Sequence, residues 1–271
     1  MAERNPSMRA LQYCPPALVP PLAPQALRNR DCQTPLKLRR REIPLSVKWE
    51  QFVPEYLPSV ENVSFVLVGA SCGANVRECA IGGDPIWNYA VACGWRGVAI
   101  EPVWNMFQRL CHHYGRFTRQ VVPIHALIAD TRGDAIVVNR GETSHMVRQR
   151  TPSGQQRNSN RSLTPRPERR EELVSSLTLH HVWPATAGAP VLVVDAEGSE
   201  PVILGHGDLP TPSPSLVLFE HVHLSDADKE GIDRNLLRQG YHKLADIEHK
   251  DRAAGELKLG AQDRLYGKSM A

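Results

Sequence analysis

The sequence predicts an α/β fold in which a mostly parallel, twisted sheet carries helices on both faces. An apolar run at residues 65–68 breaks into a turn of small residues, GASCG at 69–73. A second apolar run at 97–100 ends in Glu101-Pro102. Buried parallel strands read as continuous apolar runs of this kind. Because such runs alternate with helical patterns along much of the chain, we expect helices to cover both faces of the sheet.

The first half of the domain is expected to alternate between strand and helix. Residues 46–60 predict a short helix that packs on the domain, and the first strand is expected at 63–68. A helix should begin at Asp84-Pro85, because Asp is a favoured N-cap and Pro suits the first helical position. It should run to Cys93 and stop at Gly94. The second strand, at 97–100, is followed by apolar residues at helical spacing, which are Val103, Phe107, Leu110 and Tyr114.

The second half continues the same alternation. Further strands are expected at 121–128, 135–138, 191–194 and 216–219, and a last one after Gly240-Tyr241. The first of these closes at Asp130, and the strands at 191–194 and 216–219 end at Asp195 and Glu220. Order also returns at 173–179, and the SDAD motif at 225–228 should open a helix that reaches Gln239. The polar residues at these strand ends lie where open α/β sheets bind ligands.

Two stretches are expected to be disordered. Residues 1–45 form a leader rich in proline and arginine, and 46–271 form one catalytic domain. Residues 141–170 are rich in Arg, Ser, Asn and Pro without an apolar period, which predicts a disordered insertion or a lid. The Arg-rich leader is compatible with an organelle transit peptide, although its prolines oppose the amphipathic helix of such peptides.

Composition bounds the class of protein. The chain has 271 residues, 41% of them hydrophobic, and a net charge of +3, which gives no general nucleic-acid footprint. Its six cysteines form no Cys-x-x-Cys pair and no secretory signal precedes them, so we expect reduced thiols in an intracellular, cytoplasmic protein. No apolar run reaches the roughly 18 residues that span a bilayer.

The turn at 69–73 predicts a nucleotide ligand without phosphates. Gly69 and Gly73 let the backbone approach a ligand, and Glu101 at the tip of the next strand can accept both hydroxyls of a ribose. The turn is Gly-x-x-x-Gly, which differs from the glycine pattern of dinucleotide-binding folds, and no Lys follows it as in a P-loop. S-adenosylmethionine, an adenosine joined to a sulfonium and an amino-acid tail, fits this description.

Residues 60–244 resemble the FkbM-type methyltransferases in five ordered blocks. These are FVLVGASCG, GGDPIWNYAVACGWRGVAIEP, VVPIHALIAD, VLVVDAEGSEPVILGH and LVLFEHVHLSDAD. The resemblance implies a Rossmann-like class I methyltransferase fold, S-adenosylmethionine as cofactor, and methyl transfer to a hydroxyl of a small molecule or glycan. The chain departs from the family at Leu67, where many members have Asp or Gln, and at Ser71 and Cys72.

Five positions are the predicted contacts to the adenosine and methionine parts of the cofactor. Gly69, Ala70 and Gly73 are expected to cradle the methionine half, although an ordinary strand-to-helix turn would also use glycines. Glu101 is the predicted ribose anchor. Asp130 is placed beside the adenine, with a turn or helix cap as the alternative.

The predicted catalytic residues follow the strands at 191–194 and 216–219. Asp195 and Glu197 should lie beside the transferred methyl, where Asp195 also contacts the cofactor, and could orient the acceptor or take its proton. Glu197 could instead be a charge favoured at a helix N-terminus. His221 or His223 is a candidate base, since an imidazole removes protons near neutral pH. No metal is expected, and His221-x-His223 beside Glu220 is a better candidate for one than the His112-His113 and His180-His181 doublets.

Three rival functions remain. The departure at Leu67 allows a catalytically degenerate relative that only binds the cofactor. GASCG matches the Gly-x-Ser-x-Gly elbow of serine hydrolases, with Ser71 as nucleophile, but only a Pro-rich leader precedes it. A nicotinamide dehydrogenase is disfavoured because the glycine fingerprint is missing.

Overall fold

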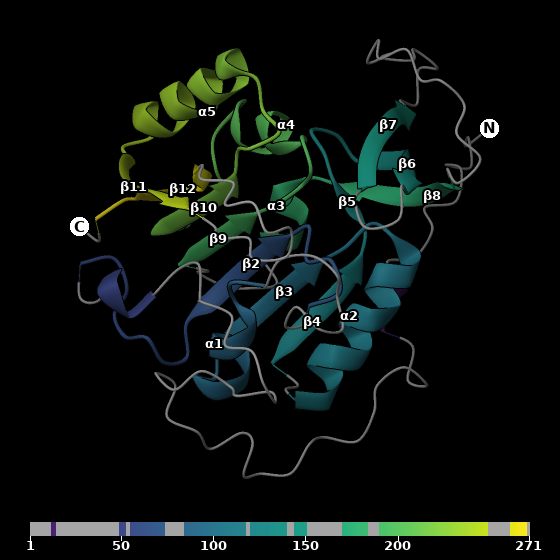
Figure 1. The fold of residues 1–271 in the computed structure, drawn as a ribbon, viewed down its shortest axis with the longest axis horizontal. Helices are drawn as coiled ribbons and strands as arrows, with labels where there is room; N and C mark the ends of the chain where they lie inside the picture. The colour runs from purple at the N-terminus through teal and green to yellow at the C-terminus, as the bar shows by residue number, and fades with distance from the viewer. Residues whose placement is uncertain are drawn as a thin grey trace, which may run out of the picture.

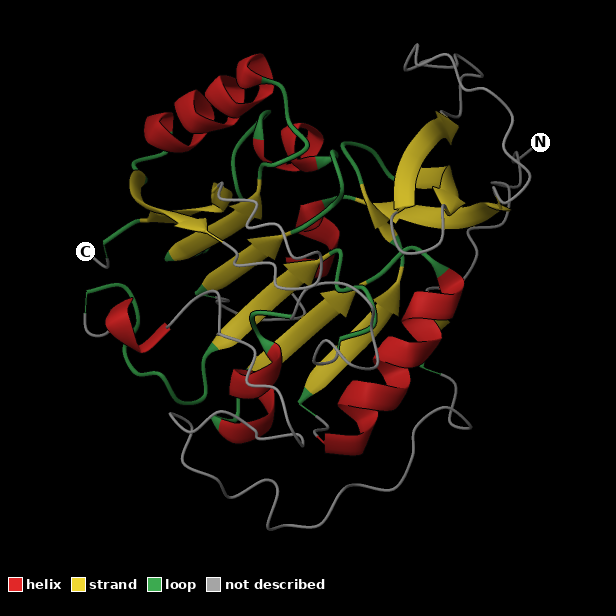
Figure 2. Cartoon of the chain, viewed as in Figure 1, coloured by secondary structure: helices red, strands yellow, loops and turns green. Residues whose placement is uncertain are grey.

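The computed structural model describes residues 12–14, 49–52, 55–73, 84–117, 120–139, 144–150, 170–183, 190–248 and 261–269. These residues form an eight-stranded sheet with flanking helices and a four-stranded sheet beside it (Figures 1 and 2). The short 3-10 helix η3 (Trp49–Phe52) stands where a helix was expected at 46–60, and Trp49 is buried in the core.

The large sheet is mostly parallel. Its order is β1 (Gln12–Tyr13), β4 (Val121–His125), β3 (Arg96–Ile100), β2 (Ser64–Val68), β9 (Val191–Val194), β10 (Leu216–Glu220), β12 (Ala261–Gly267) and β11 (His242–Glu248). The strands from β4 to β10 are parallel, whereas β1 and β12 run antiparallel to their neighbours. The expected strands at 63–68, 97–100, 191–194 and 216–219 are present, with bounds that differ by one residue at most.

Helices cover both faces of this sheet, as Figure 1 shows. On β2, Phe65 and Leu67 join the core cluster that includes residues of α1 (Trp87–Ala92) and α2 (Trp104–Phe117). Val66 and Val68 join the opposite cluster, with residues of α3 (Leu179–Val182), α4 (Glu200–Leu204) and α5 (Asp226–Arg238). Alternate strand residues face opposite sides, so one apolar run fills both cores. The predicted α/β fold class is confirmed.

Two expected helices begin close to where their sequence signals lie. Asp84 Oδ1 accepts a hydrogen bond from the Ile86 N–H at 2.7 Å, and α1 begins at Trp87, two residues later than expected. The chain leaves that helix through Gly94, which has a φ of 72°. Ser225 caps α5 by accepting from the Asp228 N–H at 3.2 Å, as expected from the SDAD motif.

The four-stranded sheet corrects two expectations. The strand expected at 121–128 is divided at Ala126 into β4 and β5 (Leu127–Ile128), which belong to different sheets. The order of the small sheet is β5, β8 (Arg170–Leu177), β6 (Gly133–Asn139) and β7 (Ser144–Arg150). Strand β7 lies inside the stretch expected to be disordered, because an edge strand is held by backbone pairing to β6 and needs no apolar period.

The remaining parts of the two stretches expected to be disordered lie outside the described residues. Within the leader, β1 pairs with β4 in antiparallel register, and Tyr13 lies opposite Ile124. Residues 151–169 of the expected insertion are among those not described.

The expectation of reduced thiols was wrong for at least three of the six cysteines, because Cys14, Cys72 and Cys111 are all disulfide-bonded. Cys14, which follows β1, forms a disulfide with Cys111 of α2 across a sequence separation of 97 residues. Antiparallel pairing of β1 with β4, whose neighbour in the fold is α2, brings the two cysteines together. Sequence spacing gave no sign of this pair because the two residues meet only through the tertiary fold. Cys93 is buried and forms no disulfide.

The order of the strands creates a switch point between β2 and β9. From β2 the chain proceeds to β3 and β4 on one side, and it later returns through β9 to β10 on the other. Open α/β sheets bind ligands at the carboxyl ends of the strands at such a point. Among the described helices, none has the length and apolar character needed to cross a membrane.

Candidate active site at the carboxyl ends of β2, β3, β9 and β10

Backbone hydrogen bonds hold the segments around the switch point together. The N–H groups of Gly69 and Ala70 both donate to the Ile100 carbonyl at 2.9 Å, which ties the turn after β2 to the end of β3. On the other side, the Asp195 N–H donates to the Val68 carbonyl at 2.9 Å. The turn, Glu101 and the loop after β9 are therefore fixed next to one another.

Contacts within the protein explain both glycines of the turn. Gly69 has a φ of 78°, and a Cβ there would overlap the carbonyl oxygen of Asp195. Gly73 has a φ of 59°, and a Cβ there would overlap side chains of Leu110 and Tyr114 in α2. Close packing thus requires glycine at each position, whether or not a ligand lies against the backbone. The cofactor cradle of Gly69, Ala70 and Gly73 stays a prediction.

Glu101 is built into the same turn. Its Oε2 accepts from the Ser71 N–H and its Oε1 from the Val103 N–H, both at 2.8 Å, so one carboxyl joins the turn to the start of α2. The side chain is buried, with the residue 4% exposed. Burial raises the pKa of Glu101 to about 7 against the effect of both hydrogen bonds, and the charges of Glu172 and Glu197 add to this rise. The predicted ribose contact would use the remaining lone pairs of these oxygens.

The loop after β9 is closed by a residue that the sequence did not single out. Glu200, at the start of α4 and 1% exposed, accepts from the N–H groups of Ala196 at 2.6 Å and Gly198 at 2.9 Å. Burial raises its pKa to about 7. Glu197, by contrast, lies within the loop with a φ of 50° and is not part of the helix. The helix-charge interpretation therefore describes Glu200 better than Glu197.

Asp195 and Glu220 form a carboxyl pair across the ends of β9 and β10. The two side chains share a hydrogen bond, which requires a proton on one of them. Asp195 is exposed to solvent, yet protein atoms crowd its carboxyl group, and this desolvation together with the charge of Glu220 raises its pKa well above the usual range. Burial, followed by the charge of Glu197, raises the pKa of Glu220 to about 7.

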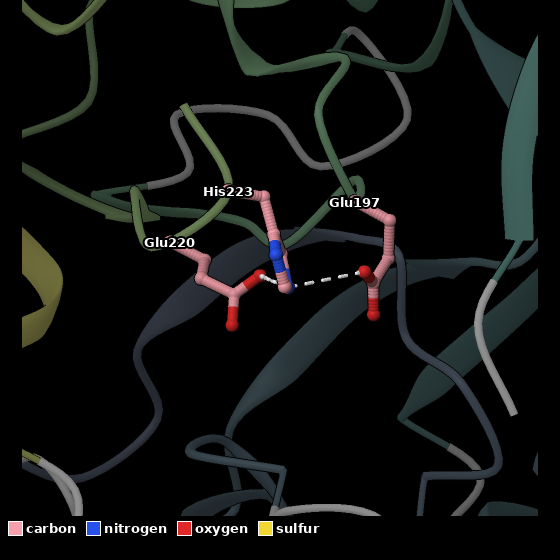
Figure 3. Close-up of side chains that lie close together, drawn as sticks. All are labelled: Glu197, Glu220 and His223. Atoms are coloured by element: carbon pink, nitrogen blue, oxygen red, sulfur yellow. Dashed lines mark ion pairs between the residues drawn. The ribbon is translucent and has the colours of Figure 1, made fainter. Parts of the chain in front are cut away.

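His223 lies between the two glutamates (Figure 3). Its Nε2 is 3.5 Å from Glu197 Oε2 and 3.7 Å from Glu220 Oε2. We refer to Asp195, Glu197, Glu220 and His223 as the β9–β10 cluster. The structure thus brings together three of the four predicted catalytic residues, along with Glu220.

His221, the other predicted catalytic residue, belongs to a different environment. It is 7% exposed, and neither ring nitrogen has a hydrogen-bond partner among the described residues. Burial lowers its pKa, and the positive charges of Arg264 and Lys229 lower it further. Its surroundings are therefore β12 and α5, and it contacts neither glutamate of the cluster in the manner of His223.

The other candidate residues lie apart from the β9–β10 cluster. Asp130 is exposed and follows β5 of the small sheet, so it does not end a strand of the large sheet as expected. His113 contacts the Cys72 carbonyl at 2.7 Å, and His181 contacts Thr178 Oγ1 at 2.7 Å. Leu67 is buried in the core on the side of α1 and α2.

Comparisons with known proteins give one distant similarity of fold. No protein-family model matches the sequence, and no curated protein matches it. One solved structure, of a proposed RNA methyltransferase from Pyrococcus horikoshii, aligns over 90% of this chain and 96% of its own length, with 11% identity and a TM-score of 0.42. A similarity at this level carries no argument about function, so the fold assignment rests on the strand order and the two cores.

Proposed function

We propose that the protein is an S-adenosylmethionine-dependent methyltransferase of the FkbM type, acting on a hydroxyl of a small molecule or glycan. The observation that carries this proposal is the placement of carboxyl groups on both sides of the switch point. Glu101 lies on the β3 side, and Asp195, Glu197 and Glu220 lie on the β9 and β10 side. A ligand with a ribose at one end and a sulfonium cation near its middle matches such a distribution of charge.

The chemistry demands little of the protein beyond placement and one proton transfer. The acceptor oxygen attacks the methyl carbon, the carbon–sulfur bond breaks with its electron pair moving to sulfur, and S-adenosylhomocysteine is left. The hydroxyl proton passes to the β9–β10 cluster. Holding the oxygen in line with the carbon–sulfur bond can contribute about 7–11 kcal/mol. A positioned proton acceptor adds about 10²–10⁴-fold.

The arrangement of the sheet disfavours the serine hydrolase. Ser71 follows β2, whereas His221 and His223 follow β10, and β9 lies between these two strands. Two strand spacings separate the positions by about 9–10 Å. The Ser71 N–H donates to Glu101 Oε2, so a carboxylate braces the turn that would have to serve as the nucleophile elbow.

The disulfide bears on the compartment. A Cys14–Cys111 bond persists in an oxidising environment and is uncommon in the cytoplasm, so it favours an oxidising compartment over the cytoplasmic one expected from the sequence.

Calorimetric titration with S-adenosylmethionine and S-adenosylhomocysteine tests the cofactor. We expect both to bind, and we expect Glu101→Ala to weaken binding by about 10- to 150-fold, the equivalent of hydrogen bonds to a charged group. Glu172→Ala is the matched control, because Glu172 Oε2 likewise accepts from the start of α2, at Trp104 N–H and 2.8 Å. If neither ligand binds the folded protein, the proposal fails. If both bind but no acceptor is methylated in a screen of hydroxyl compounds, the degenerate relative is favoured.

A further inference from the structure

Three side chains of the β9–β10 cluster converge on one point. Glu197 comes from the loop after β9, Glu220 is the last residue of β10, and His223 lies in the turn that follows. One donor atom from each, two carboxylate oxygens and one imidazole nitrogen, all lie within 4.8 Å of one another. Figure 3 shows the imidazole between the two carboxylates.

Two of the three donor separations match those around a bound metal ion. Two ligand atoms that each lie about 2.1 Å from one ion are about 3–4 Å apart, depending on coordination geometry. The two imidazole-to-carboxylate separations, 3.5 and 3.7 Å, fall within this interval. They are longer than the 2.7–2.9 Å of a charge-assisted hydrogen bond, so the imidazole has approached neither carboxylate closely enough to be its hydrogen-bond donor.

Carboxyl groups surround the three donor atoms. Asp195, Glu197 and Glu220 interact electrostatically as a group, and Glu200 and Asp263 add further negative charge around Asp195 and Glu220. A divalent cation would supply two positive charges among these carboxyl groups. Both glutamate side chains are mostly shielded from water, with exposures of 21% and 18%, which strengthens their repulsion.

The backbone holds the three donors in place. Leu224 N–H donates to the His221 carbonyl at 3.2 Å and closes the turn that carries His223. The loop that carries Glu197 is closed by the two hydrogen bonds to Glu200. Little rearrangement is therefore needed for the three side chains to reach one ion.

We propose that Glu197, Glu220 and His223 bind a divalent cation of the manganese or zinc class. A mixed set of carboxylate and imidazole ligands suits these ions, whereas an all-oxygen set would favour magnesium or calcium. Three protein ligands leave coordination positions for other oxygens, and Asp195, hydrogen-bonded to Glu220, orients that ligand from the outer shell.

The cation site rests on the geometry of three side chains, and only its use in catalysis rests on the proposed methyl transfer. A cation beside the transferred methyl would bind the acceptor hydroxyl and lower its pKa. This would select acceptors that can coordinate a metal, such as compounds with two neighbouring hydroxyl oxygens.

Titration of the full-length protein with Mn²⁺ alone, followed by the loss of the free-ion EPR signal, tests the site. We expect saturable binding that Zn²⁺ displaces, and Glu220→Gln or His223→Gln should weaken it by about 10-fold or more. The matched control is Glu230→Gln, which alters an exposed carboxylate of α5 that is paired with Arg234 at 3.5 Å. It should leave the affinity unchanged.

Two results would overturn the proposal. The first is no saturable binding of Mn²⁺ or Zn²⁺ to the folded wild-type protein. The second is binding that neither Glu220→Gln nor His223→Gln weakens relative to Glu230→Gln. Circular dichroism checks the fold of each variant, and because His223 is half-exposed, its variant provides the test even if Glu220→Gln destabilises the domain.

The titration also separates this proposal from the proposed function, because it needs neither cofactor nor acceptor. Mn²⁺ binding without S-adenosylmethionine binding would support the cation site and contradict the proposed methyltransferase function. S-adenosylmethionine binding without Mn²⁺ binding would contradict only the cation site.

Discussion

Glu101 and Glu200 each accept hydrogen bonds from two backbone N–H groups, whereas Asp195, Glu197 and Glu220 face one another and an imidazole. All of these carboxyl groups lie at the same edge of the sheet. The braced pair completes the turn after β2 and the loop after β9. In the β9–β10 cluster, neighbouring carboxyl groups raise the pKa values of Asp195 and Glu220. The difference suggests that the fold depends on the first set, and that a proton, a cation or a cationic ligand is needed by the second.

Replacement of Asp195 gives the largest expected effect. If Asp195 receives or relays the acceptor proton, Asp195→Asn should slow methyl transfer by about 10²–10⁴-fold while changing cofactor affinity much less. Single-turnover rates with an acceptor found by screening, together with calorimetry of the cofactor, measure the two effects. Equal rates for variant and wild type would rule out the proton role.

Stability should separate the two sets of carboxyl groups. Glu200→Ala leaves the N–H groups of Ala196 and Gly198 without their acceptor, so we expect a loss of about 2–4 kcal/mol in the free energy of unfolding. Glu220→Gln removes a repelled charge and should leave this free energy unchanged or raised near pH 8. Urea denaturation measures both. A greater loss in Glu220→Gln than in Glu200→Ala would contradict the comparison.

The pH dependence of stability sharpens the same contrast. The pKa of Glu220 is raised from 4.5 to about 7, so the folded state keeps a proton that the unfolded chain has already lost between these values. The free energy of unfolding should therefore fall as the pH rises from about 4.5 to 7, by up to about 3 kcal/mol for one such group. Glu220→Gln should reduce this slope when chelator is present. An identical slope in both proteins would show that Glu220 titrates normally.

The fold was more predictable than the site. Buried parallel strands such as β2 and β9 can be recognised in the sequence as apolar runs, because both of their faces are covered. Strands β1, β7 and β12 did not, since antiparallel pairing with β4, β6 and β10 depends on partners that are remote or polar in sequence. Tertiary contacts, not local pattern, decide such strands.

The site was predictable only to the level of strand ends. The sequence placed Asp195, Glu197 and His223 after two strands, and in the structure they lie near one another. Glu200 was missed because a Glu in the first turn of a helix is common and carries no special signal. His221 and His223 could not be distinguished from the sequence. The turn after Glu220 decides where each imidazole points, and no local sequence pattern encodes the shape of that turn.

Replacement of His221 gives the smallest expected effect and tests that distinction. The buried imidazole of His221 has no hydrogen-bond partner among the described residues, and burial lowers its pKa, so its polar atoms add no stability to the fold. His221→Leu should therefore change the free energy of unfolding by no more than about 1 kcal/mol, in the stabilising direction if it changes at all, because an apolar side chain is easier to bury. Thermal denaturation measures this effect.

The comparison variant is His223→Leu, which removes a half-exposed imidazole that lies between Glu197 and Glu220. It should leave stability close to that of the wild type, because surface ion pairs contribute about 0–1 kcal/mol. Methyl transfer should fall in His223→Leu and stay unchanged in His221→Leu. If His221→Leu instead abolishes transfer while remaining folded, the acceptor site extends toward β12 and α5, and the assignment of the cluster to the reacting centre is wrong.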